Sequence, residues 1–232
     1  MAEASEIVFL IDVDNTLLDN DRVTDDLRRY LTHEMGTDDA DEYFRIFEDL
    51  RTELGYADYL GALQRYRNEH LRDPHVLKLS RFLIDYPFAN RLYPESLDAI
   101  DHLKEFGPVV ILSDGDVVFQ PRKVERSGLW SAVAGNVLIY VHKEQELRDV
   151  EERFPAAHYA LIDDKLRILD AVKKVWGDRV TTVFPRQGHY AHDPKILSAY
   201  PPADVTVARI GELLKMDRSA FFSARREAGP RT

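Results

Sequence analysis

The sequence predicts an α/β protein with a doubly wound parallel sheet and a small all-helical domain inserted into it. Short apolar runs rich in β-branched residues recur along the chain. They are continuous rather than alternating, as expected for strands that are covered on both faces. Helical patterns separate most of these runs, and this alternation is typical of a parallel sheet. The runs span residues 7–11, 109–112, 137–141, 159–162 and 180–184, with a weaker run at 204–207.

The helices between the strands are indicated by spacing. Between residues 97 and 106, apolar side chains recur every third position, and the Gly-Pro pair at 107–108 is a typical helix end before a strand. The same spacing recurs at 166–175, where a glycine follows. A short final helix is predicted at 210–214.

Residues 18–91 break the alternation of strands and helices. Their apolar and aromatic residues fall at helical spacing in four groups, and no strand pattern is present. Because this stretch is far longer than a crossover needs, we expect a separate four-helix lid or cap after the first strand. The predicted boundaries are a catalytic core of residues 1–17 and 92–216, a helical cap of residues 18–91, and a flexible tail of residues 217–232.

Composition limits the class of protein. The 232 residues are 44% hydrophobic and 31% charged, with a formal net charge of −10 and no cysteine. The negative charge argues against nucleic-acid polymers and anionic membrane surfaces as partners. No apolar run is long enough to span a membrane, and the acidic first residues do not resemble a secretory signal. Without cysteine the chain has no disulfides and no thiolate chemistry, which fits a cytoplasmic location.

Chemically active side chains follow the first four apolar runs, at the point where each strand should end. Ligands of open parallel sheets bind in the crevice at this edge. Two carboxylates at the tip of a buried strand are also costly unless a cation or hydrogen-bond donors neutralise them. Together the side chains suit a divalent cation and a phosphate. They are Asp12 and Asp14; Ser113, Asp114 and Gly115; His142 and Lys143; and Asp163 and Asp164.

In this order the motifs resemble those of the haloacid dehalogenase-like superfamily, in the phosphatase branch with a helical cap inserted after the first motif. Residues 12–16, Asp-Val-Asp-Asn-Thr, resemble the first motif, and residues 112–115, Leu-Ser-Asp-Gly, resemble the second. Gln120 and Lys123 continue the helix that usually follows. Lys143 stands where the third motif has its lysine, and Leu-Ile-Asp-Asp at 161–164 resembles the fourth. The resemblance covers the core and implies a Rossmann-like sheet.

The resemblance implies covalent phosphoryl transfer. Asp12 would be the nucleophile that attacks phosphorus and forms an aspartyl-phosphate, as carboxylates can in covalent catalysis. Asp14 would protonate the leaving alkoxide and then deprotonate the hydrolytic water. Family members that cleave carbon–halogen bonds lack an aspartate at the position of Asp14. Phosphonate-cleaving members lack it as well and use a cap lysine, whereas this cap region holds only Lys78.

The remaining motif residues would bind the phosphate and the metal. Ser113 and Lys143 are expected to contact phosphoryl oxygens, together with the backbone amide of Gly115 and with Asp114, which stands where the family most often has asparagine. The expected cofactor is Mg²⁺, which prefers oxygen ligands and keeps several waters. Its expected ligands are Asp12, the backbone carbonyl of Asp14, Asp163 and Asp164.

The sequence therefore predicts a magnesium-dependent phosphatase acting on a small phosphorylated metabolite. A phosphomutase acting on a sugar phosphate has the same core motifs, and a non-catalytic binding module could retain the fold. Four residues also have simpler interpretations. Lys143 could be a solvated lysine, Asp164 could cap the following helix, and His189 with its neighbour His192 fits a polar loop better than a metal pair.

Overall fold

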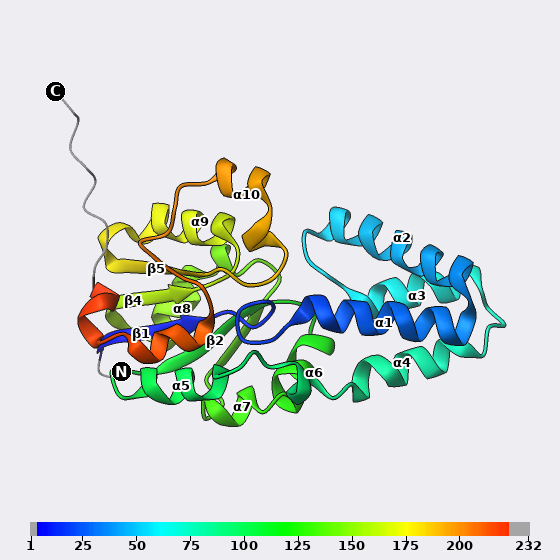
Figure 1. Ribbon diagram of the computed structural model, residues 1–232, viewed down its shortest axis with the longest axis horizontal. Helices are drawn as coiled ribbons and strands as arrows, with labels where there is room; N and C mark the ends of the chain where they lie inside the picture. The colour runs from blue at the N-terminus through cyan, green and yellow to red at the C-terminus, as the bar shows by residue number, and fades with distance from the viewer. Residues whose placement is uncertain (1–3, 223–232) are drawn as a thin grey trace.

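The computed structural model describes residues 4–222 and contains a six-stranded sheet, which lies in the left-hand part of the molecule in Figure 1. All strand pairs are parallel, and the strand order is β3-β2-β1-β4-β5-β6. The predicted α/β class with a parallel sheet is therefore confirmed, and β1 lies in the interior of the sheet. The strands are β1 (Ser5–Ile11), β2 (Val109–Asp114), β3 (Val137–Tyr140), β4 (Ala156–Ile162), β5 (Val180–Pro185) and β6 (Val205–Val207).

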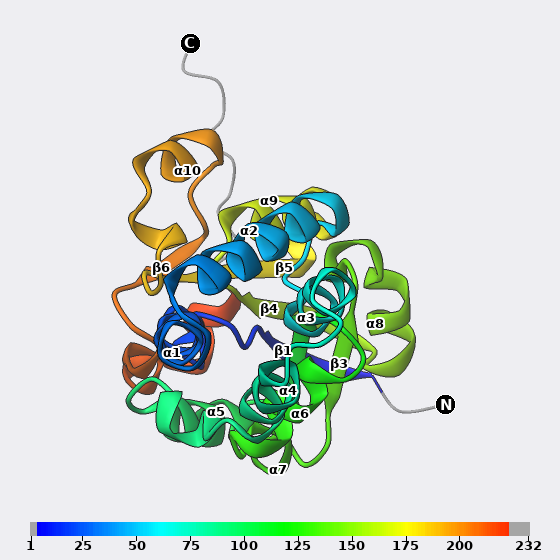
Figure 2. The same ribbon diagram turned by 90° about the vertical axis from the view of Figure 1, so that its right-hand side faces the viewer.

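Helices cover both faces of the sheet. Alternate residues of each strand point to opposite faces, so each apolar strand buries side chains beneath both helical layers. From β1, Phe9 packs in one hydrophobic cluster and Leu10 in another. Figure 2 shows the two helical layers. The first is α5 (Ser96–Lys104), α6 (Phe119–Arg126) and α7 (Leu129–Ala132); the second is α8 (Leu147–Arg153) and α9 (Leu166–Trp176). Buried on both faces, β1 gives its carboxyl end a fixed position.

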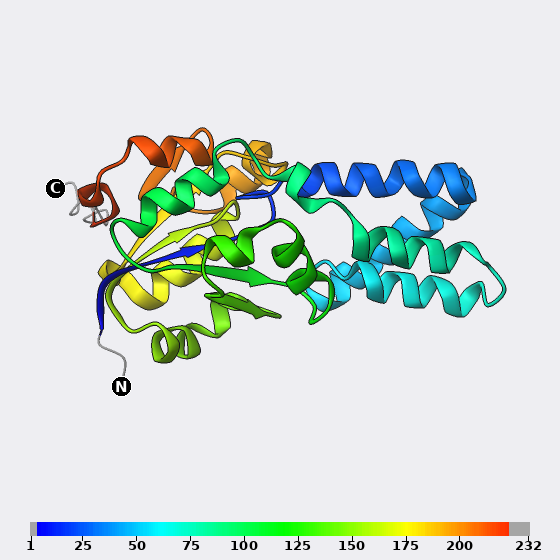
Figure 3. The ribbon, with the colours of Figure 1, turned by 90° about the horizontal axis from the view of Figure 1, so that it is seen from below.

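Four α-helices lie between β1 and α5 and extend away from one end of the sheet (Figure 3), and a short 3₁₀ helix, Phe88–Arg91, follows them. The side chain of Asp19 caps the first helix and that of Asp58 caps the third, each by accepting a hydrogen bond from a backbone N–H. Gly55 ends the second with a φ of 80°, which glycine adopts without strain. The helices are α1 (Asn20–Met35), α2 (Thr37–Leu54), α3 (Tyr59–Glu69) and α4 (His75–Asp85). We call them the helical insertion.

The two chain segments that connect the helical insertion to the core lie side by side. Leu18 and Leu92 form an antiparallel bridge. On either side of it, Asp19 donates its N–H to the Arg91 carbonyl at 2.8 Å, and Tyr93 donates to the Leu17 carbonyl at 2.9 Å. The chain thus leaves and re-enters the core through one paired linker, just beyond the end of β1.

The C-terminal part of the described chain agrees with the expectation in one place and differs in another. The short helix expected at 210–214 is present as a 3₁₀ helix, Ile210–Lys215. Residues Arg218–Phe222 were expected to belong to a flexible tail, yet they form another short 3₁₀ helix. It is held by Phe221, which is fully buried and meets Phe9 edge to face with ring centroids 5.0 Å apart. The rest of the expected tail, 223–232, lies outside the described residues.

Between residues 4 and 222, none of the helices has both the length and the apolar character needed to cross a membrane.

Candidate active site

Three buried carboxylates meet at the carboxyl ends of β1 and β4. These strands are neighbours, and their register places Ile11 beside Ile162, so the residues that follow are adjacent as well. Asp12, Asp163 and Asp164 are each at most 2% exposed, and one carboxylate oxygen of each lies within 4.8 Å of the others. We call these three residues the acidic centre.

Lys143 lies against the acidic centre and is only 1% exposed, so it is not a solvated surface lysine. Its Nζ lies 2.5 Å from Asp12 Oδ1 and 2.6 Å from Asp163 Oδ2, and it also donates to the Leu112 carbonyl at 3.1 Å. Burial alone would lower the pKa of Lys143, but the carboxylates of Asp12 and Asp163 outweigh it and hold that pKa well above its usual value. The lysine therefore remains an ammonium ion.

The acidic centre holds three carboxylates, and the positive charges that act on it come from two lysines, Lys143 and Lys165. Burial raises the pKa of Asp163 to about 6, although the ammonium of Lys143 acts in the opposite direction, and burial also raises the pKa of Asp164 well above its usual value. Asp12 Oδ2 and both carboxylate oxygens of Asp164 accept no hydrogen bond from any described residue. Buried oxygens of this kind fit a hard divalent cation such as Mg²⁺, which would supply the missing charge.

Asp164 does not cap the helix that follows it. Its carboxylate oxygens accept no hydrogen bond within residues 4–222, while its backbone N–H donates to Thr16 Oγ1 at 3.1 Å. That contact ties the fourth motif to the first. In the first motif, Asn15 has a φ of 60°, and its Oδ1 accepts from the N–H groups of Asn20 and Asp21. Asn15 and Thr16 therefore shape the turn that leads from β1 into the helical insertion.

Asp14 lies apart from the acidic centre. Its carboxylate, 25% exposed, accepts two hydrogen bonds from Lys123 Nζ, at 2.6 and 2.9 Å. Lys123 comes from α6, is 1% exposed and also donates to Asn20 Oδ1 at 3.0 Å. Gln120, one turn earlier on α6, donates to Ser113 Oγ at 2.9 Å. The sequence places Gln120 and Lys123 on one face of this helix, but it does not reveal their partners.

Two residues of the second motif, Asp114 and Gly115, are hydrogen-bonded to the chain segment at 140–143. Asp114 Oδ1 accepts the backbone N–H of Lys143 at 2.8 Å and so positions that lysine. The expected phosphate donor, the amide of Gly115, instead donates to the Tyr140 carbonyl at 2.9 Å. Glycine is required at this position because a Cβ would lie 2.6 Å from the Cβ of Gln120. Ser113 is 1% exposed. The side-chain amide of Gln120 contacts both Ser113 Oγ and the carboxylate of Asp14, so Ser113 and Asp14 lie close together.

A cavity of about 950 Å³ lies between the core and the helical insertion. From the core it is lined by Asp14, Asp114 and Lys123, and from the insertion by Tyr56 and Tyr59, among others. The segment after β5 closes one side. There His189 pairs with Asp21 at 2.6 Å, and Tyr190 is hydrogen-bonded to Arg51 of α2. This agrees with a polar loop rather than a metal pair at His189 and His192, and the acidic centre is the only metal-ligand cluster found within residues 4–222.

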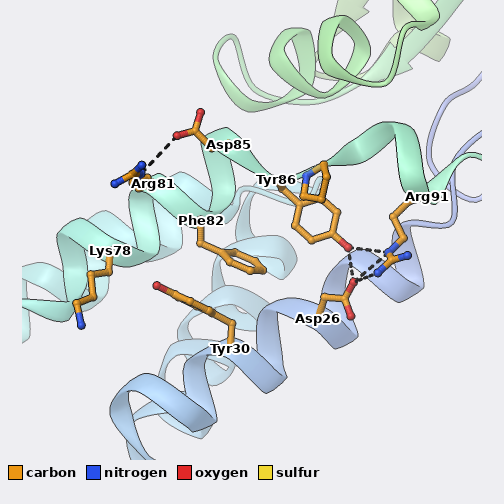
Figure 4. Close-up of a pocket in the computed structure, with 9 residues that line it drawn as sticks. Asp26, Tyr30, Lys78, Arg81, Phe82, Asp85, Tyr86 and Arg91 are labelled. Carbon is orange, nitrogen blue, oxygen red and sulfur yellow. Dashed lines mark hydrogen bonds and ion pairs between the residues drawn. The ribbon is translucent and has the colours of Figure 1, made fainter.

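A second pocket, of about 630 Å³, lies between α1 and α4 of the helical insertion. Figure 4 shows Tyr86 and Arg91 converging on the carboxylate of Asp26, while the rings of Tyr30 and Phe82 stack. Arg91 lies 2.6 Å from Asp26, so this carboxylate already neutralises it. The pocket contains none of the predicted site residues.

We expect Asp26→Asn to destabilise the protein by about 2 kcal/mol at pH 7, since it removes hydrogen bonds to a charged group that is 15% exposed. Burial would raise the pKa of Asp26, but hydrogen bonds from Tyr86 and Arg91 outweigh it and hold that pKa below 3.8. The stabilisation is thus present above roughly pH 4 and is lost as the pH falls through the lowered value.

Urea unfolding of the wild type and Asp26→Asn between pH 7 and pH 3 measures this effect. Asp41→Asn is the matched control, because the ion pair of Asp41 with Arg28 is exposed and should contribute about 0.5 kcal/mol or less. A destabilisation by Asp26→Asn that stays constant down to pH 3 would contradict the assigned cause.

The parallel sheet and its buried carboxylate centre define an α/β protein with a candidate metal site, and comparison with known proteins gives the family. Residues 8–175 match the model of the haloacid dehalogenase-like hydrolases, so the chain belongs to this family. A crystal structure from Burkholderia xenovorans LB400, of a protein provisionally named a haloacid dehalogenase-like hydrolase, is 65% identical. It covers 92% of this chain and 99% of its own, with a TM-score of 0.89. No curated protein matches the chain.

More distant structures share the fold. YfnB from Bacillus subtilis, provisionally named a HAD-hydrolase and determined with bound magnesium, is 17% identical with a TM-score of 0.60. It covers 91% of this chain and 98% of its own. L-2-haloacid dehalogenase from Xanthobacter autotrophicus, with chloropropionic acid covalently bound, is also 17% identical. Its TM-score is 0.58, and it covers 90% of this chain and 96% of its own.

Proposed function

We propose that this hydrolase is a magnesium-dependent phosphatase that acts on the phosphate monoester of a small metabolite, with the helical insertion as the cap over its site. The observation that carries the proposal is the placement of Asp14. Its partly exposed carboxylate lines the large cavity, whereas Asp12 lies in the acidic centre. Ester cleavage needs a proton for the leaving oxygen, and a second carboxyl at the cavity supplies a donor.

In the first step, a carboxylate oxygen of Asp12 forms a bond to phosphorus while the bond from phosphorus to the ester oxygen breaks. The leaving oxygen takes the proton of the Asp14 carboxyl and departs as an alcohol. In the second step, water attacks phosphorus and gives a proton to the Asp14 carboxylate. The bond between phosphorus and Asp12 then breaks, which releases phosphate and restores both aspartates.

Lys143 supports both steps. Its ammonium holds Asp12 Oδ1 at 2.5 Å and so fixes the orientation of the nucleophile. The same positive charge would stabilise phosphoryl oxygens as negative charge builds on them. Ser113 is proposed as a further phosphate contact. We assign Asp114 to the positioning of Lys143, because its carboxylate already accepts the lysine N–H and would repel a phosphate.

The acidic centre is the proposed magnesium site, with Asp12, Asp163 and Asp164 as side-chain ligands and the backbone carbonyl of Asp14 as a further one. When bound, Mg²⁺ would offset the charge of these carboxylates and polarise the phosphoryl group. The unpartnered oxygens of Asp12 and Asp164 support this assignment.

Dehalogenation is the second candidate function, because related folds include an L-2-haloacid dehalogenase. Its reaction also begins with a carboxylate nucleophile, but halide leaves without a proton. Dehalogenation would not use Asp14 as a proton donor, and so would not need Lys123 to position it. The phosphatase is therefore favoured.

We expect the purified protein to release phosphate from 4-nitrophenyl phosphate with Mg²⁺ present, and EDTA to lower this rate by about 100-fold or more. Under the same conditions we expect no chloride release from 2-chloropropionate. Both products are measured from one enzyme preparation, with added Mg²⁺ restoring the rate after EDTA. Chloride release without phosphate release would instead identify a dehalogenase. A panel of phosphorylated sugars, analysed for product identity, separates hydrolysis from a mutase reaction.

A further inference from the structure

We propose that Lys123 is a positioning residue that fixes the carboxylate of Asp14 at the leaving-group side of the site and links it to the helical insertion. The inference rests on the proposed phosphatase function and adds a residue to it. Lys123 would not touch the substrate or the metal. It would act through Asp14, on the proton transfer to the leaving oxygen.

The ammonium of Lys123 is fully hydrogen-bonded within the protein. At 1% exposure, its Nζ donates to both oxygens of Asp14 and to Asn20 Oδ1, so all three of its hydrogens have a partner. A buried ammonium is costly unless it is paired and hydrogen-bonded in this way. Asp14, in contrast, is partly exposed and could be hydrated without any partner. The fold thus buries the ammonium of Lys123 beside Asp14, although the carboxylate of Asp14 is exposed enough to be solvated by water alone.

A series of contacts connects Lys123 to the helical insertion. Asn20, which accepts from Lys123, donates to the Tyr59 hydroxyl at 3.4 Å, and that hydroxyl lies 2.8 Å from Thr24 Oγ1. Tyr59 is 2% exposed at the start of α3, and its ring centroid lies 5.1 Å from that of Phe119 on α6. Burial raises the pKa of Tyr59 to about 12, so its hydroxyl remains neutral.

These contacts join the core and the helical insertion at one place. Lys123 and Phe119 both come from α6, and each touches the chain of contacts that leads to Tyr59. When the insertion is seated against the core, the two oxygens of Asp14 are fixed by Lys123 and Lys123 is fixed by Asn20. The insertion thereby contributes one of the three hydrogen bonds that hold the ammonium beside Asp14.

Comparing kcat for two esters with different leaving groups distinguishes a positioning role of Lys123 from a purely structural one. A structural role would lower kcat equally with both esters. Phenyl phosphate has a poor leaving group that needs a proton, whereas 4-nitrophenyl phosphate has a good one that needs it much less. We therefore expect Lys123→Met to lower kcat with phenyl phosphate by roughly 100-fold, and the loss with 4-nitrophenyl phosphate to be at least tenfold smaller. The matched control is Lys174→Met, which removes an exposed ion pair with Asp170 on α9.

A double-mutant cycle tests whether Lys123 acts through Asp14. If it does, adding Lys123→Met to Asp14→Asn should lower kcat with phenyl phosphate by less than about threefold. If Lys123→Met does not fold, Asn20→Ala is the variant that tests the positioning role in its place. It removes one hydrogen bond from Lys123 and should cost roughly fivefold, again mainly with phenyl phosphate.

Equal losses with both substrates in folded Lys123→Met, or additive losses in the cycle, would overturn the positioning role while the phosphatase function stands. If Lys123→Met does not fold, equal losses with both substrates in Asn20→Ala would overturn it instead. If the wild type releases phosphate from neither ester, the proposed function itself fails. Lys174→Met should match the wild type with both esters.

Discussion

Replacing Asp12 with asparagine is expected to lower phosphate ester hydrolysis by on the order of 10⁴-fold or more, because it removes the proposed nucleophile. Asparagine has nearly the same shape, and the cost of three buried carboxylates falls when one becomes neutral. The variant should therefore fold at least as well as the wild type in the absence of Mg²⁺. The loss should appear in kcat with 4-nitrophenyl phosphate, where leaving-group protonation matters little.

Two measurements check this expectation. Acid quenching with a ³²P-labelled ester should trap a phosphorylated wild-type protein and no phosphorylated Asp12→Asn. Asp98→Asn, an exposed aspartate on α5, is the control for a change of one charge. Hydrolysis that survives in Asp12→Asn at a similar rate would exclude the aspartyl-phosphate mechanism.

Lys143→Met is expected to destabilise the metal-free protein by about 3–5 kcal/mol. The substitution leaves Asp12 and Asp163 without the ammonium that lies 2.5 and 2.6 Å from their oxygens. Burial already disfavours ionisation of Asp163, so the loss of this charge leaves the buried carboxylates with Lys165 as their remaining positive neighbour. Mg²⁺ should recover part of the loss by supplying positive charge at the same place.

Urea unfolding in EDTA and in Mg²⁺ measures both effects. Lys104→Met removes a solvent-exposed ion pair with Asp101 and should change stability by about 0.5 kcal/mol or less. We expect Mg²⁺ to raise the unfolding midpoint of Lys143→Met more than that of the wild type. A loss below about 1 kcal/mol in EDTA would mean that Lys143 does not neutralise the acidic centre.

The sheet and the meeting of distant residues at its edge could be predicted from the sequence, because both follow from simple periodicities. Continuous apolar runs identify buried parallel strands, and the ends of neighbouring strands must lie together. Asp12, Asp163 and Lys143 are brought together in this way. The fold is confirmed, and the family membership agrees with the resemblance of the motifs. The catalytic and metal-binding roles of these residues stay predictions.

Other parts of the site depend on contacts that no local pattern encodes. Helical spacing places Lys123 on the same face of α6 as Gln120, but only the packing of α6 beneath the insertion brings Lys123 to Asp14. The amide of Gly115 looked available at the end of a strand, yet the ladder between β2 and β3 continues one residue further and uses it. Likewise, a single aromatic residue, Phe221, holds a segment whose composition suggested a flexible tail.

Because Leu18 and Leu92 pair with each other, the helical insertion is attached to the core at a single place. Since the chain departs and returns at adjacent positions, four helices could be exchanged for another unit of any length without shifting the register of a single strand. The acidic centre and Lys143 would be unaffected, because all four residues lie on the core side of that junction. The same exchange would remove Asn20 and Tyr59, and with them the hydrogen bonds that link Lys123 to the insertion, so a new insertion would have to supply its own partner for Lys123.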